Sequence, residues 1–263
     1  MGHGMPDERS SQSEWGARAA IHGDSLRAVL LKGLPGSVNL HIDRWHRAVL
    51  RAAFNGAQRS RKPTLDLGCG YGRLAQEMVT LDQPLVVGAD YAPEFCRLFQ
   101  ARYGDAVCCD LSSLPFADES FSHAYAVTAL MYLDFARAQE ALRSLDRCVD
   151  RGARVLLLEP GAEFNQSVRL VLRRKRGEPL ARPGFTIRQF NREMAPPNWK
   201  RLASGSNLWT TLMLPILIPL ARVGRASAFL EGICSRLDQP RMGSQEEWLS
   251  RYALHRWVLF EVQ

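Results

Sequence analysis

The feature that most constrains the fold is a series of short apolar runs that alternate with helical patterns, beginning at Thr64. Apolar strands without polar alternation are typical of a parallel sheet that helices cover on both faces. The expected strands are 64–67, 85–90, 106–110, 124–130 and 153–159. Apolar residues at helical spacing predict the intervening helices 73–80, 93–103 and 135–149. The sequence therefore predicts an α/β fold.

Two helices are expected before this alternation. Residues 14–32 have helical spacing, and a Gly- and Pro-containing break follows at 33–36. Asn39 is the expected cap of a second helix that ends near Phe54. Residues 1–13 are polar and lack the apolar stretch of a signal peptide, so we expect a disordered tail and a cytoplasmic protein.

The region after residue 160 is expected to be mainly helical and to close the sheet. Helices are predicted at 163–176 and 186–194, and strands at 199–204 and 256–262. Between these strands, residues 208–238 are expected to form an apolar helical insertion. The whole is then a Rossmann-like, seven-stranded, mostly parallel sheet with an antiparallel last strand. The expected parts are a tail (1–13), N-terminal helices (14–62), a ligand-binding core (63–160) and a region of the same domain that completes the sheet (161–263).

Charge and cysteine usage narrow the possible partners. The formal net charge is +7, carried mostly by arginine, which permits nucleic acid, an anionic membrane or an acidic substrate but also arises from composition bias. The six cysteines form no C-x-x-C pair and have no histidine at ligand spacing, so we expect no metal and no disulfide framework. The most apolar run, 212–223, is shorter than the roughly 20 residues of a membrane span, and we expect it to be buried or interfacial.

A glycine-rich loop follows the first expected strand. Gly68, Gly70 and Gly72 allow a tight turn and the close approach of a ligand to the backbone. The helix after the loop has unpaired N–H groups, which suit a carboxylate or a phosphate. A glycine loop alone is a weak signal, so the residues after it decide the interpretation.

Acidic residues are expected at the carboxyl edge of the sheet. Asp90 ends the second strand, 22 residues after Gly68, where an acid accepts hydrogen bonds from ribose hydroxyls. Asp110 ends the third strand, a further 20 residues along. With Asp66 they would line the edge at which open α/β sheets bind ligands. Asp90 as a helix cap and Asp110 as a turn residue are the alternatives.

The segments LDLGCGYGRLA, VVGAD and CCDLSSLPFADESF resemble the class I S-adenosylmethionine-dependent methyltransferases, specifically the type 11 small-molecule subgroup, over about residues 64–160. The resemblance implies that S-adenosylmethionine is the cofactor. Its methionine part would lie at the glycine loop, its ribose at the acid of strand two, and its adenine amino group at the acid of strand three. The implied cofactor-binding residues are Asp66, Gly68, Cys69, Gly70, Gly72, Asp90, Tyr91, Asp110, Leu111 and Thr128.

The resemblance also implies that the N-terminal helices fold over the cofactor as a lid, and the later helices are expected to shape the acceptor pocket. The chain departs from the family at Ser122-His123, where an aspartate is common, and at Ala92, where a serine is frequent. Neither position is expected to affect cofactor binding.

A nicotinamide dinucleotide enzyme is the competing hypothesis. Its fingerprint is G-x-G-x-x-G/A, and Arg73 stands where the third small residue belongs. A bulky arginine there opposes close helix–strand packing, and a second acidic strand end at Asp110 has no role in such an enzyme. Methyl transfer is therefore favoured.

The acceptor side is less constrained, because methyl transfer from a sulfonium depends more on positioning than on a base. His41 and Tyr132 are the candidate catalytic residues, and His123 and His255 are expected to be structural. The candidate substrate residues are Met131, Tyr132, Glu159 and Arg173. For Arg173, within a basic cluster, and for His41 and His46, a solvated helix face is the alternative.

The predicted function is methylation of an oxygen or nitrogen atom of a small organic molecule, in a biosynthetic pathway, by a monomer or homodimer without a nucleic-acid partner. Two alternatives stay open. The acceptor is a lipid or glycan precursor at a membrane surface, or the chain is a scaffold subunit that binds the cofactor without catalysis.

Overall fold

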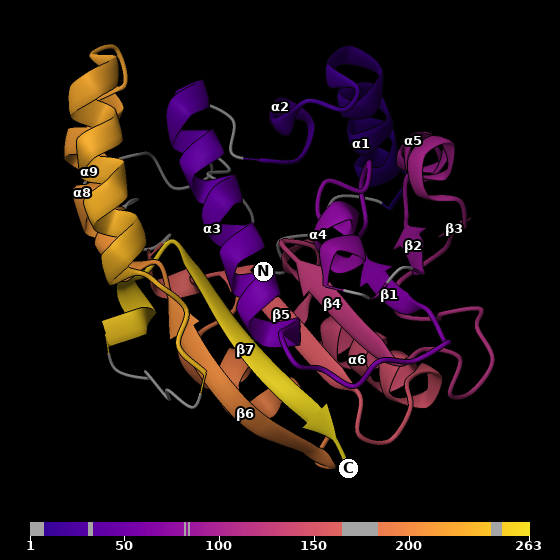
Figure 1. Cartoon of the computed structure of the whole chain (residues 1–263). Coiled ribbons are helices and arrows are strands. Elements are labelled where there is room, and N and C mark those ends of the chain that lie inside the picture. The colour runs from indigo at the N-terminus through magenta and orange to yellow at the C-terminus, as the bar shows by residue number, and fades with distance from the viewer. Residues whose placement is uncertain (1–7, 31–33, 82, 84, 165–183, 243–248) are drawn as a thin grey trace, which may run out of the picture.

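The computed structural model describes residues 8–30, 34–81, 83, 85–164, 184–242 and 249–263. Its centre is a seven-stranded sheet with the strand order β3-β2-β1-β4-β5-β7-β6 (Figure 1). The strands are β1 (Thr64–Leu67), β2 (Val86–Asp90), β3 (Ala106–Cys108), β4 (His123–Val127), β5 (Arg154–Pro160), β6 (Trp199–Ser206) and β7 (His255–Val262). β1 to β5 pair in parallel, and β7 runs antiparallel to both β5 and β6. The predicted fold class is confirmed.

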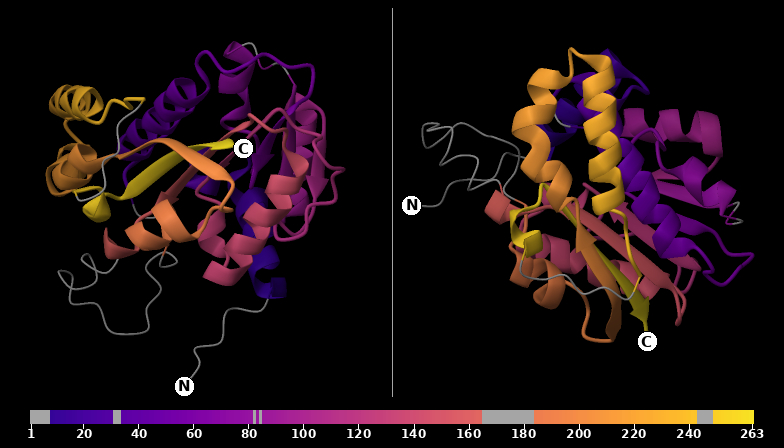
Figure 2. Two further views of the ribbon diagram at one scale, coloured as in Figure 1. Left: turned by 90° about the horizontal axis from the view of Figure 1, so that it is seen from below. Right: turned by 60° about the vertical axis from the view of Figure 1, so that its left-hand side comes forward.

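The helices form layers on both faces of this sheet and extend beyond it (Figure 2). They are α1 (Glu8–His22), α2 (Leu26–Val29), α3 (Gly36–Phe54), α4 (Ala75–Thr80), α5 (Pro93–Tyr103), α6 (Phe135–Cys148), α8 (Leu208–Leu220) and α9 (Gly224–Leu237). The described residues also contain the short helical turns η1 (Leu130–Tyr132), η2 (Gln189–Glu193) and η3 (Leu249–Tyr252).

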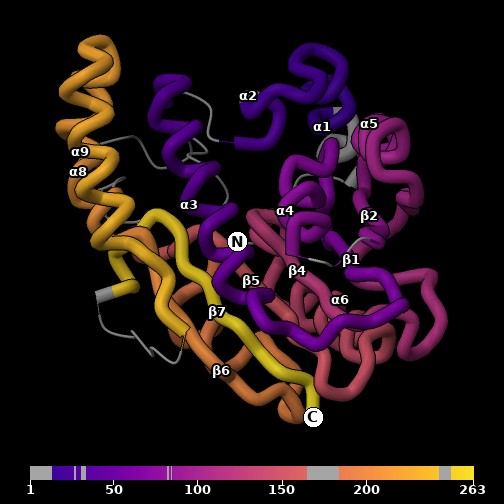
Figure 3. Tube along the Cα trace, in the orientation of Figure 1, coloured from indigo at the N-terminus to yellow at the C-terminus, as the bar shows by residue number. Residues whose placement is uncertain are grey.

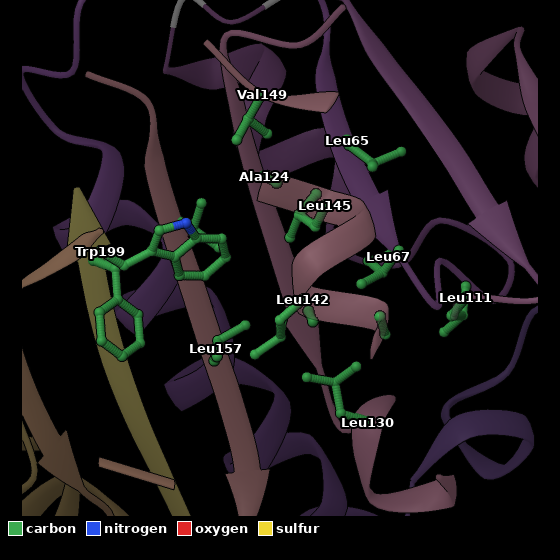
Figure 4. Close-up of a cluster of buried hydrophobic side chains, with 14 of the residues drawn as sticks. Leu65, Leu67, Leu111, Ala124, Leu130, Leu142, Leu145, Val149, Leu157 and Trp199 are labelled. Carbon is green, nitrogen blue, oxygen red and sulfur yellow. The ribbon is translucent and has the colours of Figure 1, made fainter. Parts of the chain in front are cut away.

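Alternate residues of the central strands point to opposite faces of the sheet. Ala124 of β4 belongs to the core beneath α6, together with Leu142 and Leu145 of that helix (Figure 4). Tyr125, the next residue of β4, belongs to the core on the other face, beneath α3, α4 and α5. Because both faces are covered, the central strands are mostly apolar, and each fully buried leucine contributes roughly 1.5–3 kcal/mol to stability.

The N-terminal helices lie over the end of the sheet that carries the glycine loop. Trp15 of α1 packs on Phe95 of α5 with ring centroids 6.1 Å apart, and Arg102 pairs with Asp24 after α1. The side chain of Val29 in α2 lies beside Gly70 of the loop. These contacts place the first two helices as a cover on the glycine loop.

In the N-terminal helices, three boundaries differ from the sequence expectation. α1 begins at Glu8, inside the expected tail 1–13, and the expected helix 14–32 is interrupted after His22. α3 begins at Gly36 after Pro35, three residues before the expected cap Asn39. Proline is compatible with a helix start. Pro35, which lies in the expected break, therefore directly precedes the helix.

The expected insertion between the last two strands consists of α8 and α9, which lie antiparallel beside α3 (Figure 3). Leu214 and Leu217 of α8 and Cys234 of α9 share a core with Val38 and Ile42 of α3. The insertion therefore buries the side of α3 that faces away from the glycine loop. Within the described residues, no helix is long and apolar enough to cross a membrane.

Candidate functional site

The glycine loop packs tightly against its own protein at its two ends. Gly68 and Gly72 have φ angles of 75° and 81°. A Cβ at Gly68 would lie 2.3 Å from the Cβ of Ala129, and one at Gly72 would lie 2.6 Å from the ring of Tyr103. The backbone N–H groups of Gly68 and Cys69 both donate to the carbonyl of Ala89, at 2.7 and 3.1 Å. Both ends of the loop thus need glycine for packing.

Gly70, in the middle of the loop, is different. Its φ is 53°, and an added Cβ would have one described neighbour, Cγ1 of Val29 at 3.1 Å. Its N–H donates to Oδ2 of Asp90 at 2.9 Å. A loop backbone that is bare on its outer side is what the close approach of a ligand requires.

Asp90 ends β2 next to this loop. Its two carboxylate oxygens accept N–H bonds from Ala92 and Gly70, each at 2.9 Å. Burial raises the pKa of Asp90, although these backbone bonds act in the opposite direction. Each oxygen keeps a further lone pair, so the carboxylate is oriented by the backbone and can still accept a hydroxyl.

Asp110 lies at the same edge, on the neighbouring strand connection. Asp90 pairs with Cys108 in the sheet register, and the N–H of Cys109 donates to the Asp90 carbonyl at 3.0 Å. Asp110 accepts from the N–H and hydroxyl of Ser112, and Arg137 donates to it at 2.5 Å. Partial burial would raise its pKa, but the bonds from Ser112 and the positive charge of Arg137 lower the pKa below the usual value. The residue is an ionised acceptor, placed in the turn after β3 rather than in the strand.

Asp66 lies within β1 rather than at the edge. It is buried, and the hydroxyl of Tyr125 on β4 donates to its Oδ2 at 2.8 Å. Burial raises the pKa of Asp66 to about 7, while the bond from Tyr125 and the charge of Arg73 oppose the rise. The structure thus brings two of the three expected carboxylates together at the edge and sets the third beneath the loop.

The remaining candidate cofactor residues surround the loop. Leu111 lies with its Cδ1 4.0 Å from the Cβ position of Gly68. Tyr91 follows Asp90 directly, and its carbonyl accepts from the thiol of Cys108 at 3.5 Å. Cys69 is buried, and burial keeps its thiol pKa well above the usual value, so it offers backbone rather than a reactive sulfur.

Thr128 has an unusual backbone conformation directly after β4. Its φ is 55°, and its N–H donates to the carbonyl of Leu158 at 2.7 Å. Positive φ costs a β-branched residue on the order of 1–3 kcal/mol, and such residues cluster at functional sites. The strained turn directs the chain into η1, which contains Met131 and Tyr132.

Glu159 supports this turn from β5. Its carboxylate accepts three backbone N–H bonds, from Ala129 at 3.0 Å, Leu130 at 2.8 Å and Met131 at 3.2 Å. Burial raises the pKa of Glu159 to about 8 against the effect of these bonds. With both oxygens bonded within the protein, Glu159 holds the turn, and the geometry gives no support to the predicted contact with the acceptor.

Tyr132 meets the N-terminal cover. Its ring packs edge-on against Trp15 of α1, with centroids 4.8 Å apart. The aromatic contact joins the turn after β4 to a helix near the start of the chain. This position, between the sheet edge and the cover, is consistent with the predicted role of Tyr132 near the acceptor.

The predictions for His41 and His46 need correction. Both are buried, so neither belongs to a solvated face. His41 Nε2 lies 2.9 Å from the hydroxyl of Thr210 on α8, and His46 lies 3.4 Å from His255. His41 therefore joins α3 to the insertion, away from the loop. His123 and His255 are buried, and their structural role stays a prediction, while Arg173 lies outside the described residues.

Arg73 is a residue whose role the sequence pattern did not show. Its guanidinium is buried and donates to Asp43 at 2.8 Å and to His46 at 3.1 Å, both on α3. Arg47 also donates to Asp43, at 2.7 Å. The residue directly after the glycine loop is thus tied to α3. Two features of the sequence could have indicated this tie. One is an arginine at a position where small residues usually pack, and the other is an acid, Asp43, on an otherwise apolar helix face.

The described residues contain no group of three or more His, Cys, Asp and Glu side chains that is placed to hold a metal ion. The donor set at the edge instead suits a nucleoside: a bare loop backbone at Gly70, and two carboxylates that accept hydrogen bonds on adjacent strand connections. The residues present therefore fit the cofactor that the sequence resemblance implies.

Comparison with known proteins agrees with this geometry. Residues 65–157 match a family described as methyltransferase domain. An O-methyltransferase of Aspergillus sclerotiorum, resE, is 31% identical over 103 residues, which cover 36% of this chain and 38% of that protein. A malonyl-[acyl-carrier protein] O-methyltransferase of Herminiimonas arsenicoxydans is 35% identical over 94 residues, or 35% of each chain. The matches thus span less than two fifths of these relatives.

Solved structures share the fold over the whole chain. The geranyl diphosphate C-methyltransferase of Streptomyces coelicolor superposes with a TM-score of 0.60 and 13% identity, covering 98% of this chain and 99% of that one. The magnesium protoporphyrin IX methyltransferase of Synechocystis gives a TM-score of 0.55 at 12% identity, with complete coverage of both. Residues 65–157 are therefore similar to a methyltransferase domain, and the whole chain shares the fold of these solved methyltransferases.

Proposed function

We propose that this protein transfers a methyl group from S-adenosylmethionine to an oxygen or nitrogen atom of a small organic acceptor in a biosynthetic pathway. The observation that carries the proposal is the pairing of β2 with β3, which sets Asp90 and Asp110 on adjacent strand connections beside the bare backbone of Gly70. The named relatives that act on oxygen support the choice of acceptor atom.

The residues of the chain would act mainly by positioning. Bound S-adenosylmethionine supplies a methyl group that its sulfonium charge already activates. Asp90, whose carboxylate is held by two backbone N–H groups, would orient the ribose through its hydroxyls. Asp110 would accept from the adenine amino group. Holding both reactants in line contributes on the order of 7–11 kcal/mol, which makes a general base dispensable for some acceptors.

The acceptor would lie beside η1, on the side of Tyr132 and Met131. Trp15 packs on Tyr132, so α1 and the turn after β4 together can exclude water from the reacting atoms. Tyr132 has a hydroxyl that can bond to an acceptor. His41 and Glu159 would act only indirectly, since each is already bonded within the protein.

Calorimetric titration with S-adenosylmethionine tests the cofactor site. Asp90→Ala should weaken binding by about 1–3 kcal/mol, because the ribose hydroxyls lose their partner. Gly70→Val should abolish binding, since a valine is strained at a φ of 53° and its side chain would cover the loop backbone that the ligand approaches.

Asp105→Ala and Gly152→Val are the matched controls. Asp105 is an exposed acid before β3, and Gly152 has a φ of 82° before β5, at the opposite end of the sheet. Both controls should bind like the wild type. Equal dissociation constants in all five proteins would remove the site assignment.

Catalysis is tested separately from binding. Incubation with a panel of hydroxyl- and amine-bearing acceptors should release S-adenosylhomocysteine with at least one of them. Cofactor binding without product for any acceptor would instead favour the alternative of a non-catalytic cofactor-binding subunit.

A further inference from the structure

The α8–α9 hairpin has an unusually apolar outer face. Its inner side, which includes Leu214, Leu217 and Cys234, packs on α3. Successive turns of α8 present Trp209, Leu212 and Ile216 on the opposite side, and they are 43%, 52% and 46% exposed. The outer apolar face of the hairpin is defined by its exposed large apolar residues Trp209, Leu212, Ile216, Val223, Phe229, Ile233 and Leu237. Large apolar side chains that stay exposed together on one hairpin mark an interaction surface.

The exposed charged side chains of the hairpin are all positive. In the continuously described segment 208–238, the two acids are both buried. Glu231 accepts from Ser227 and pairs with Arg44 at 3.6 Å, and Asp238 accepts from the N–H groups of Trp209 and Thr210. The arginines of the same segment are exposed, namely Arg222, Arg225 and Arg236. The outer face therefore combines apolar side chains with positive charge alone.

The hairpin also stands in a defined position relative to the candidate site. In Figure 1 it projects beyond the sheet on the side where α1, α2 and the start of α3 lie. That is the side of the glycine loop, because Val29 of α2 lies beside Gly70. A flat surface that touched the hairpin would thus lie near the edge where the acceptor is expected.

We propose that the outer face of the α8–α9 hairpin docks on an anionic lipid membrane surface. Arginines bind the headgroup phosphates while Phe229, Leu212 and Ile216 enter the boundary between headgroups and acyl chains. That the acceptor is then taken from the bilayer rests on the proposed methyl transfer, whereas membrane docking itself does not.

A second copy of the chain fits this face less well. A two-fold interface places the same patch on both partners, so its arginines would lose water without an acidic partner from the other copy's patch. An anionic bilayer supplies hydrocarbon and negative charge at the same depth as the residues that need them. Charge complementarity thus selects the lipid surface.

Vesicle co-sedimentation of the full chain tests the proposal without any turnover. The wild type should sediment with phosphatidylcholine vesicles that contain phosphatidylglycerol, and less with phosphatidylcholine alone. Added salt should release it, since screening weakens the arginine contacts. Phe229→Ser and Arg222→Glu should each weaken binding roughly tenfold, through lost apolar insertion and reversed charge.

Two variants outside the hairpin are the matched controls. Leu85→Ser removes an exposed leucine before β2, and Arg143→Glu makes the same change of net charge on α6. Both should bind vesicles like the wild type. Circular dichroism melts check that each variant is folded, and Ile216→Ser replaces Phe229→Ser if the latter unfolds.

Three results would overturn the proposal. One is a wild type that stays in the supernatant with anionic vesicles at low salt. Another is equal binding by Phe229→Ser and Leu85→Ser. The third is a wild type that ignores vesicles but loses a dimer in Phe229→Ser on gel filtration, which would make a second copy the occupant. Since no cofactor or acceptor is added, failure here leaves the calorimetric test of the methyl-transfer site independent.

Discussion

At the residue scale, the surroundings of Asp66 and Asp110 shift the pKa values of these two carboxyl groups in opposite directions. Asp66 is buried beside Tyr125, and its pKa rises to about 7. Asp110 is partly exposed and bonded to Ser112 and Arg137, and its pKa falls. The sequence indicated where these acids lie but not their charge, because Arg137 and Tyr125 approach from distant segments.

The raised pKa of Asp66 predicts a pH dependence of stability. Between the unfolded value of 3.8 and the folded value of about 7, the native state keeps a proton that the unfolded state has released. The free energy of unfolding therefore falls as the pH rises through this range, by up to a few kcal/mol, and Asp66 adds no further change above it. An asparagine at this position does not titrate and can still accept from Tyr125, so Asp66→Asn should lack this component.

Urea denaturation at pH 5 and pH 8 measures the effect. The loss of unfolding free energy between the two should be smaller in Asp66→Asn than in the wild type. Comparison with the wild type cancels the titration of other groups, including Glu159. An identical loss in both proteins would show that Asp66 is already ionised in the fold at low pH.

Long-range partners also bear on the roles expected of His41 and Glu159, which stay predictions. His41 bonds Thr210, which lies 169 positions away in sequence, and Glu159 bonds a turn about 30 positions earlier. Their side chains are chemically suited to catalysis, and only the tertiary structure shows that their bonding groups are already in use.

At the element scale, boundaries with their own local signals were predicted well. The expected helix 93–103 coincides with α5, since Pro93 occupies its first turn and Gly104 ends it with a φ of 97°. The predicted start of α3 and the predicted extent of the tail were wrong. Pro35 directly precedes α3, and the segment from Glu8 is helical.

Arg73 connects two elements and predicts coupling between them. Arg73→Met would leave Asp43 and His46 of α3 without this buried partner, and should lower the free energy of unfolding by about 1–3 kcal/mol. Cofactor affinity should fall as well, since the glycine loop loses its tie to α3.

A double-mutant cycle separates this pairing from general damage. Asp43→Asn combined with Arg73→Met should destabilise less than the sum of the single changes, as expected for residues in contact. Strict additivity in urea denaturation would mean that the two side chains do not stabilise each other.

At the scale of the whole molecule, the middle of the chain was the predictable part. Strand–helix alternation and the motifs between residues 64 and 160 predicted the parallel part of the sheet and the position of Asp90 and Asp110 on adjacent strand connections. The flanking helices have no comparable motif. The family resemblance implied that the N-terminal helices fold over the cofactor, but the individual contacts of the flanking helices are seen only in the tertiary structure. The burial of α3 by α8 and α9 and the apolar outer face of that hairpin belong to this second part.

A crystal structure of the chain with S-adenosylhomocysteine tests the central claim most directly. The account predicts ribose hydroxyls on the carboxylate of Asp90, the adenine amino group at Asp110, and the amino-acid part of the ligand along the backbone at Gly70. An adenosine bound elsewhere, or one whose sugar and base touch neither carboxylate, would contradict it.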